Sequence, residues 1–335
     1  MSAAMKRTLA TTASAVVLLG WGWAAPAQAD DGADGADGVE RIAGQIERAA
    51  PDAGQDMLTA RTEAGGRGLA ARGAGTAIDL PDNSRDTLTL ARPGKDRAPL
   101  AVGMPEGAAQ RPAQLAADGT VAYPDALPHT DLAVQPMERS ARVQTVLKSA
   151  AAPTEFTYPV EVPDGGRLTK GKDGSVAVLD ARGAPVGAIE APWAKDADGR
   201  AVPTTYRIEG EKLIQTVRHQ GAAHPVVADP WMGQDLIQDA KWVWVHAVQK
   251  YTLQITPTNF MKGQPSDYFI AQAAWEELLA KYQQPLGIHR NHGGLWDQFL
   301  CHHQFALFAG NTWNIEDWRP DISYPGTIWA QCNPE

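Results

Sequence analysis

Short runs of β-forming residues recur along the middle of the chain, and each run is bounded by residues that favour turns. Between residues 76 and 231 the runs are separated by Pro-Asp, Asp-Gly and Gly-Gly pairs. Closely spaced strands joined by such turns are typical of an antiparallel sandwich or barrel. The sequence therefore predicts a mostly β module, an antiparallel sandwich, over residues 76–231. The runs expected to be strands are 88–90, 120–123, 143–147, 156–162, 176–179, 206–208 and 213–217.

The first 29 residues have the order of segments found in a secretory signal peptide. Two basic residues come first, residues 9–25 carry no charge, and Ala-Gln-Ala at 27–29 precedes an acidic pair. This order is the secretory pattern. The apolar stretch is about 16 residues long, short of the ~20 that span a bilayer. We therefore expect cleavage between Ala29 and Asp30 and a secreted, extracellular product. The alternative is that the stretch stays as a membrane anchor.

The charge of the chain limits the partners to expect. The formal net charge is −9, and removing the two basic residues of segment 1–29 would make it −11. An acidic protein lacks the basic surface that general nucleic-acid coating requires. No later apolar stretch reaches membrane-spanning length, so we expect no membrane association after signal removal. The sequence indicates no cofactor, and it leaves an extracellular or cell-wall ligand as the partner to test.

Composition divides the chain further. Residues 30–75 are rich in Ala, Gly and Asp and have little to bury, so they are expected to form a disordered leader. Within it, Val39, Ile42 and Ile46 have helical spacing, which allows one or two amphipathic turns. The predicted order is thus a signal peptide (1–29), a leader (30–75), a β-rich module (76–231) and a C-terminal unit (232–335).

Tryptophan and cysteine are concentrated in the C-terminal unit. Of the 11 tryptophans, two precede residue 30 and eight of the other nine lie at or beyond Trp231. The two cysteines are Cys301 and Cys332, and in an exported protein they are most simply one disulfide. A catalytic thiol is the alternative. Apolar spacing predicts a hairpin at 241–255, helices at 267–283 and 295–308, and strands or short turns at 313–318 and 327–331, which together make a small α+β domain.

Two resemblances accompany this division. Residues 189–197, 202–206 and 225–231 resemble parts of the β-rich N-terminal module of many secreted proteins from high-GC Gram-positive bacteria, which implies a carrier or presentation domain. The C-terminal unit is similar to the DUF2599 family, which implies a C-terminal domain of secreted proteins and no particular activity. The motifs that carry this second resemblance are Pro257-Thr258, Trp275 with Glu277-Leu278, Gln298-x-x-Cys301-His302, Trp313-Asn314-Ile315-Glu316-x-Trp318-Arg319-Pro320 and Cys332-Asn333-Pro334.

Elimination leaves histidine as the side chain for any chemistry in the C-terminal unit. Its two serines, Ser266 and Ser323, lie outside a G-x-S-x-G elbow, and neither a phosphate-binding loop nor H-E-x-x-H is present in the mature chain. Histidine is the usual acid–base group near neutral pH. Four histidines fall within 15 residues: His289, His292, His302 and His303.

The candidate catalytic residues are His302, Glu316, Arg319 and Gln298. His302 is the first choice as the acid–base group, with Glu316 to orient it and Arg319 to hold an anion. His303 is expected to be a solvated bystander, because it points about 100° away from His302 on a helix. The structural alternative makes Glu316 and Arg319 an internal ion pair. A zinc alternative uses His289 and His292 as weak metal ligands.

Three functions compete on this evidence. The first is a small hydrolase or toxin-like effector that uses His/Glu acid–base chemistry. The second is a non-catalytic extracellular module that binds cell-wall glycan or a protein. The third is a structural envelope protein. Whether the chain is an enzyme stays open. An enzyme is expected to gather its histidines around a concave pocket, whereas a binding module is expected to expose aromatic rings.

Overall fold

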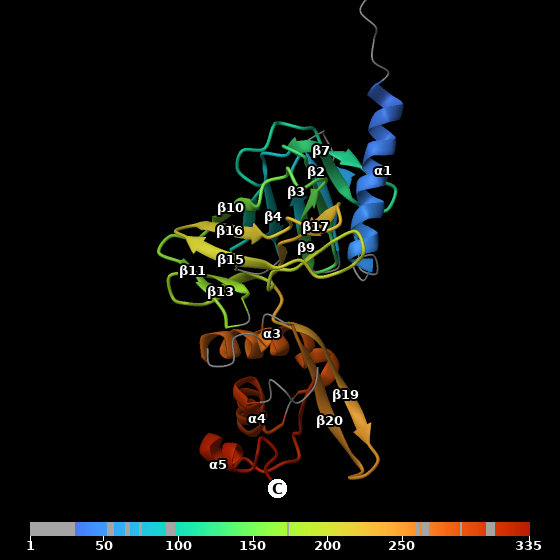
Figure 1. Ribbon diagram of the computed structural model, residues 1–335. Coiled ribbons are helices and arrows are strands. Elements are labelled where there is room, and N and C mark those ends of the chain that lie inside the picture. The colour runs from blue at the N-terminus through green and yellow to red at the C-terminus, as the bar shows by residue number, and fades with distance from the viewer. Residues whose placement is uncertain are drawn as a thin grey trace, which may run out of the picture.

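The computed structural model describes residues 31–51, 57–63, 68–73, 76–91, 98–172, 174–258, 261–262, 268–288, 290–305 and 312–335 (Figure 1). Within these ranges the chain is mostly β-structure in antiparallel sheets, and the helices lie toward the two ends of the sequence. The expected fold class, a mostly β module followed by a small α+β unit, is confirmed. The expected cleavage site at Ala29 and Asp30 lies outside the described residues. No helix in the described ranges is both long and apolar enough to cross a bilayer.

Two large sheets build the β-rich module, and every run that the sequence marks as a strand overlaps one of their strands, although runs 120–123 and 156–162 each extend one residue beyond it. The first sheet has the order β1 (Arg61–Thr62), β2 (Leu69–Arg72), β3 (Ala77–Leu80), β4 (Thr87–Ala91), β5 (Leu100–Gly103), β10 (Glu155–Glu161), β16 (Lys212–Val217) and β15 (Thr204–Glu209). The second has the order β11 (Arg167–Lys170), β12 (Val176–Leu179), β13 (Pro185–Ile189), β18 (Trp231–Gly233), β9 (Ser140–Leu147), β8 (Thr130–Pro136), β7 (Val121–Leu127) and β6 (Gln114–Leu115), while β17 (Val226–Ala228) pairs with β9 and with β14 (Ala194–Lys195).

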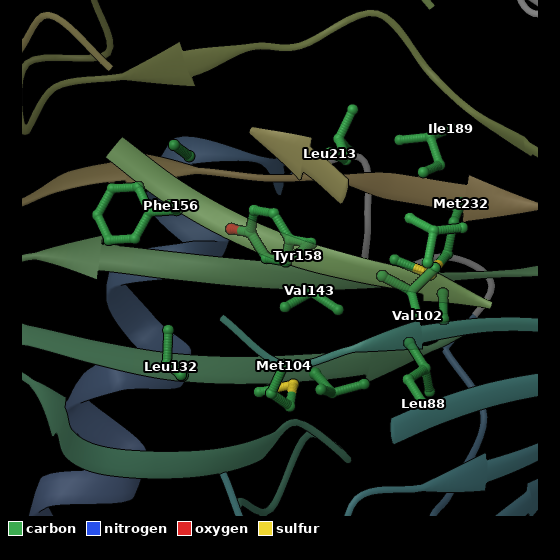
Figure 2. Packing of buried hydrophobic residues seen from close by; sticks show 14 of the residues in the cluster. Leu88, Val102, Met104, Leu132, Val143, Phe156, Tyr158, Ile189, Leu213 and Met232 are labelled. Carbon is green, nitrogen blue, oxygen red and sulfur yellow. The ribbon is translucent and has the colours of Figure 1, made fainter. Parts of the chain in front are cut away.

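The inward faces of these two sheets share one apolar core. Figure 2 shows Tyr158 of β10 among side chains from the second sheet, including Val143 of β9. Strand β10 alternates as its sequence predicts: Phe156, Tyr158 and Val160 are buried while the residues between them are more exposed. Fully burying side chains of this size contributes about 1.5–3 kcal/mol each, so this alternation fixes which face of the strand points inward.

Helix α1 (Asp31–Ala49) corrects the expectation for the leader. It lies along the outer face of the second sheet, beside β7, β9 and β17 (Figure 1). The sequence predicted only one or two helical turns here, within a disordered segment. Val39, Ile42 and Ile46 do form the apolar stripe, and they pack on a patch of small side chains that includes Ala122 and Ala133. Strands β1 and β2 also lie within residues 30–75 and extend the edge of the first sheet.

The C-terminal unit pairs a small sheet with three helices. Its sheet has the order β19 (Ile237–Val245), β20 (Lys250–Pro257) and β21 (Trp313–Ile315), and its helices are α3 (Tyr268–Leu286), α4 (His292–Phe305) and α5 (Ser323–Trp329). The predicted hairpin and the two predicted helices are confirmed. Their bounds differ, because α3 continues through Pro285 and α4 begins at His292. Helix α5 occupies residues where a strand or short turn was expected. The two cysteines are paired as expected, with their Sγ atoms 1.99 Å apart.

A buried carboxylate joins the C-terminal unit to the β-rich module. Glu277 of α3 accepts the backbone N–H groups of Leu236 and Ile237, each at 3.1 Å, just where the chain leaves the module. Lys281, one helical turn further on, lies 2.9 Å from the same carboxylate. The apolar core of the unit also takes in Ala177, Leu179 and Ala188 from β12 and β13 of the module. The division of the chain at residues 231–232 stays a prediction.

Candidate functional site

Gln298 of α4 holds the segment that follows β21. Its side chain is fully buried. The Nε2 group donates to the carbonyl oxygens of Gly294 at 3.0 Å and Glu316 at 2.9 Å, and Oε1 accepts the N–H of Glu316 at 3.0 Å. Both amide hydrogens of Gln298 are therefore committed to the backbone. The geometry makes Gln298 a residue that positions Glu316.

Glu316 and Arg319 pair with each other. The Nε group of Arg319 donates to Oε2 of Glu316 at 2.6 Å, and Thr252 of β20 donates its hydroxyl to the other carboxylate oxygen at 2.6 Å. Arg319 also donates from Nη1 to the carbonyl oxygen of Pro334 at 3.0 Å. This arrangement is the internal ion pair of the structural alternative. A catalytic role for either residue stays a prediction.

His302 lies near this pair but is not tied to it by a hydrogen bond. Burial lowers the pKa of His302 below its ordinary value, the Asn314 backbone and the charge of Glu316 oppose the change, and the charge of Arg319 adds to it. Neither ring nitrogen makes a hydrogen bond of ordinary geometry in the described part of the chain. The lowered pKa favours the neutral ring, and both ring nitrogens are buried although the residue as a whole is partly exposed.

The other histidines differ from expectation or lie outside the site. His303 is fully buried against Trp313, with ring centroids 6.0 Å apart, which corrects the prediction of a solvated bystander. The cause is the packing of α4 on β21, since Phe299, one turn earlier, contacts the same ring. His292 is exposed and lies 3.1 Å from the carbonyl oxygen of Ile288. His289 lies outside the described residues. Among those that are described, no three His, Cys, Asp or Glu side chains are grouped as metal ligands would be.

The cleft of the C-terminal unit lies between the β19–β20 hairpin and the segment after β21, and has a volume of about 480 Å³. None of the three described histidines of the cluster, His292, His302 and His303, is among its lining residues. We call it the aromatic cleft because three rings form its walls. Its lining residues are Trp242, Lys250, Tyr251, Gly287, Asp317 and Trp318.

Two of the rings of the aromatic cleft, those of Trp318 and Tyr251, contact neighbouring groups of the unit. The indole N–H of Trp318 donates to the carbonyl oxygen of Tyr251 at 3.0 Å. The Tyr251 ring contacts the ring of Trp244 at a centroid distance of 5.0 Å, yet Tyr251 remains 54% exposed. Such rings offer a flat apolar surface that loses little conformational entropy when a ligand binds.

Two charged side chains complete the cleft. The Nζ atom of Lys250 lies 4.2 Å from the ring centroid of Trp318. The carboxylate of Asp317 makes no hydrogen bond or ion pair with any described residue. The sequence predicted the hairpin that carries Trp242 and Tyr251, but not its proximity to Asp317 and Trp318. That proximity depends on the pairing of β20 with β21, whose residues are about 60 positions apart in the chain.

A comparison with protein-family models concerns the same part of the chain. Residues 238–335 match the model of a family described as a protein of unknown function, DUF2599. Uncharacterized proteins of Mycobacterium tuberculosis and Mycobacterium bovis are 36% identical to this chain over 67 residues. That match covers 19% of this chain and 42% of the mycobacterial proteins, so the chain spans about two fifths of the length of the curated relatives it matches.

Proposed function

We propose that the protein is secreted and that its C-terminal unit is a non-catalytic module that binds an extracellular or cell-wall ligand. The observation that carries the proposal is the aromatic cleft, in which the Trp242, Tyr251 and Trp318 rings line an open cavity. Concave sites lined by aromatic side chains with a few polar groups are the usual form of ligand sites in proteins. Sugar rings and other flat ligands stack on such walls.

The residues first expected to catalyse a reaction support this choice by where they lie. Glu316 is buried and bound by Arg319 and Thr252, and Gln298 is committed to the backbone. A general acid or base must reach its substrate within about 3 Å. His302 is not among the residues that line the cleft.

Hydrolysis remains the competing function, and one observation favours it. Burial lowers the pKa of His302, which favours its neutral form, and the charge of Glu316 acts on it in the opposite direction. A neutral imidazole near a carboxylate is the pairing that acid–base catalysis uses. For this function, His302 would need a route to solvent that the aromatic cleft does not provide.

A retention experiment separates the two functions. The chain from residue 30 to residue 335 is incubated with insoluble peptidoglycan and with polysaccharides, and the bound fraction is measured. Tyr251→Ala removes the most exposed ring of the cleft and should abolish retention. Trp329→Ala is the matched control, because Trp329 is 89% exposed on α5 and does not line the cleft. Retention that is unaffected by Tyr251→Ala, or no retention on any material, would contradict the proposal.

The same samples test for hydrolysis. Soluble fragments released from glycan or RNA are measured with the unaltered chain and with His302→Gln. A binding module releases none. Release that His302→Gln abolishes in a folded protein would establish the hydrolase in its place.

A further inference from the structure

We propose that the aromatic cleft recognises an organic ammonium group, and that Lys250 occupies the position of that group when no ligand is bound. This inference rests on the proposed binding function and names the chemistry of the ligand. The geometry that carries it is a cation over the Trp318 ring beside a carboxylate that no described residue neutralises.

Lys250 is attracted to the cleft by the Trp318 ring. It is an exposed residue on β20, and its Nζ atom lies 4.2 Å from the ring centroid. No hydrogen bond or ion pair holds this ammonium group within the described residues. An ammonium group over an indole is attracted by the negative face of the ring. Because the Trp318 ring is its only such contact among the described residues, the ammonium group of Lys250 can leave at little cost.

The second cation over Trp318 is not exchangeable in this way. The guanidinium carbon of Arg319 lies 4.7 Å from the ring centroid, but Arg319 is bound to Glu316 and to the carbonyl oxygen of Pro334. Arg319 is therefore fixed beside the ring by its own partners, and Lys250 is the cation that a ligand would displace.

Asp317 gives the cleft a second attraction for cations. Its carboxylate is half-buried and lines the cleft beside Trp318. It forms no ion pair with Lys250, since the two charged groups are not within 4.0 Å of each other. A carboxylate together with three aromatic rings is the set of groups that binds ammonium ligands in aromatic cages.

The opposite choice, an anionic ligand held by Lys250, fits less well. The carboxylate of Asp317 would repel an anion in the same small cleft, and the chain as a whole carries a formal charge of −9. The two choices predict opposite effects when Lys250 loses its charge. An ammonium ligand binds more tightly because its competitor is gone, whereas an anionic ligand loses its partner.

Small ions test the inference directly on the full mature chain, residues 30–335. Tetramethylammonium, methylammonium and acetate are titrated while the indole N–H signals are followed by NMR. Lys250→Gln should bind tetramethylammonium about fivefold more tightly, the effect of removing one exposed cation–π contact that competes with the ligand. Lys241→Gln is the matched control, because Lys241 is an exposed lysine on the same hairpin that does not line the cleft.

Asp317→Asn separates the contributions of the carboxylate and the rings. This isosteric change should weaken both ammonium ions, and methylammonium more strongly, because only methylammonium can donate hydrogen bonds to the carboxylate. The relative affinities of the two ions show whether the natural ligand is a primary or a quaternary amine.

Three results would overturn the inference: no ammonium ion shifts the Trp318 signal, Lys250→Gln fails to tighten ammonium binding, or acetate binds and loses affinity in Lys250→Gln. If retention on cell-wall material still depends on Tyr251 in such a case, only the ammonium assignment fails. If that retention is absent as well, the proposed binding function fails with it.

Discussion

The Nε group of Arg319 donates to Oε2 of Glu316 across 2.6 Å, and both side chains are largely buried. The hydroxyl of Thr252 donates to the other carboxylate oxygen, and the carbonyl oxygen of Pro334 accepts a hydrogen bond from Nη1 of Arg319. The pair therefore connects β20, the segment after β21 and the end of the chain. The guanidinium group of Arg319 also lies over the Trp318 ring, 4.7 Å from its centroid. The pair thus supports the wall of the aromatic cleft.

Removing the charge of Glu316 should destabilise the C-terminal unit. In Glu316→Ala the buried guanidinium of Arg319 loses its partner, and breaking a buried ion pair from one side costs about 3–5 kcal/mol. Urea unfolding followed by tryptophan fluorescence measures the loss. Glu335→Gln, an exposed change at the chain end, should stay within about 0.5 kcal/mol. A Glu316→Ala protein as stable as the unaltered chain would show that the pair is not a structural joint.

Glu277 should control the junction between the module and the C-terminal unit. Glu277→Ala leaves the N–H groups of Leu236 and Ile237 without their acceptor, at a cost of about 1–3 kcal/mol for each buried group. Amide hydrogen exchange at these two residues should accelerate. Glu276→Ala, the exposed neighbour on α3, is the matched control and should leave both rates unchanged. Equal exchange in the two variants would remove Glu277 from this role.

The strands of the module could be predicted because their information is local. In β10 the alternation of buried and exposed residues is visible in the sequence, and turn residues mark the ends of the runs. Helix α1 could not be predicted at its full length, because its stability comes from Ala122 and Ala133, which lie about 80–90 positions further along the chain. Propensity alone gives such a helix little stability.

In the candidate site, too, local sequence information was predictive, whereas contacts between distant residues were not. The sequence grouped Gln298, Glu316 and Arg319 with His302 as candidate catalytic residues, and the structure links the first three by hydrogen bonds. The pairing of Glu316 with Arg319 was one of the sequence alternatives, but the residue types could not reveal that the Gln298 amide would bind the backbone of Glu316. The aromatic cleft was missed because the contact of Trp318 with Tyr251 spans 67 positions and leaves no periodic signal.

Asp229 should make the module less stable as the pH rises. Burial raises the pKa of Asp229 to about 8, partly offset by the charge of Arg142 and by hydrogen bonds with Trp193. Between about pH 4, where the unfolded chain loses this proton, and pH 8, the native protein retains it. Stability therefore decreases with rising pH through this window, by about 6 kcal/mol in total.

Asp229→Asn removes the titrating carboxyl group and so tests whether Asp229 causes this pH dependence of stability. The variant should be more stable than the unaltered chain at pH 8 and about equal to it at pH 4, as measured by urea unfolding at a series of pH values. Asp164→Asn, at an exposed turn, should leave the pH profile unchanged. A profile that Asp229→Asn does not flatten would mean that the carboxylate is already ionised in the native protein.

Loss of the link between Cys301 and Cys332 should destabilise the C-terminal unit more than the module. The link closes a loop with a sequence separation of 31, so in the chain-entropy account it contributes about 3–4 kcal/mol. It fastens α4 to the chain end that follows α5, where Arg319 also binds Pro334. Cys332→Ser, or reduction of the unaltered chain, should lower the midpoint of unfolding reported by the tryptophans of the unit. Because the cores of the unit and of the module are largely separate clusters, β-sheet signals from the module should change less.

Reduction of the Cys332→Ser protein is the control and should have no further effect. If the two cysteines are found as free thiols in protein purified under oxidising conditions, or if their loss leaves the midpoint unchanged, the link does not stabilise this unit.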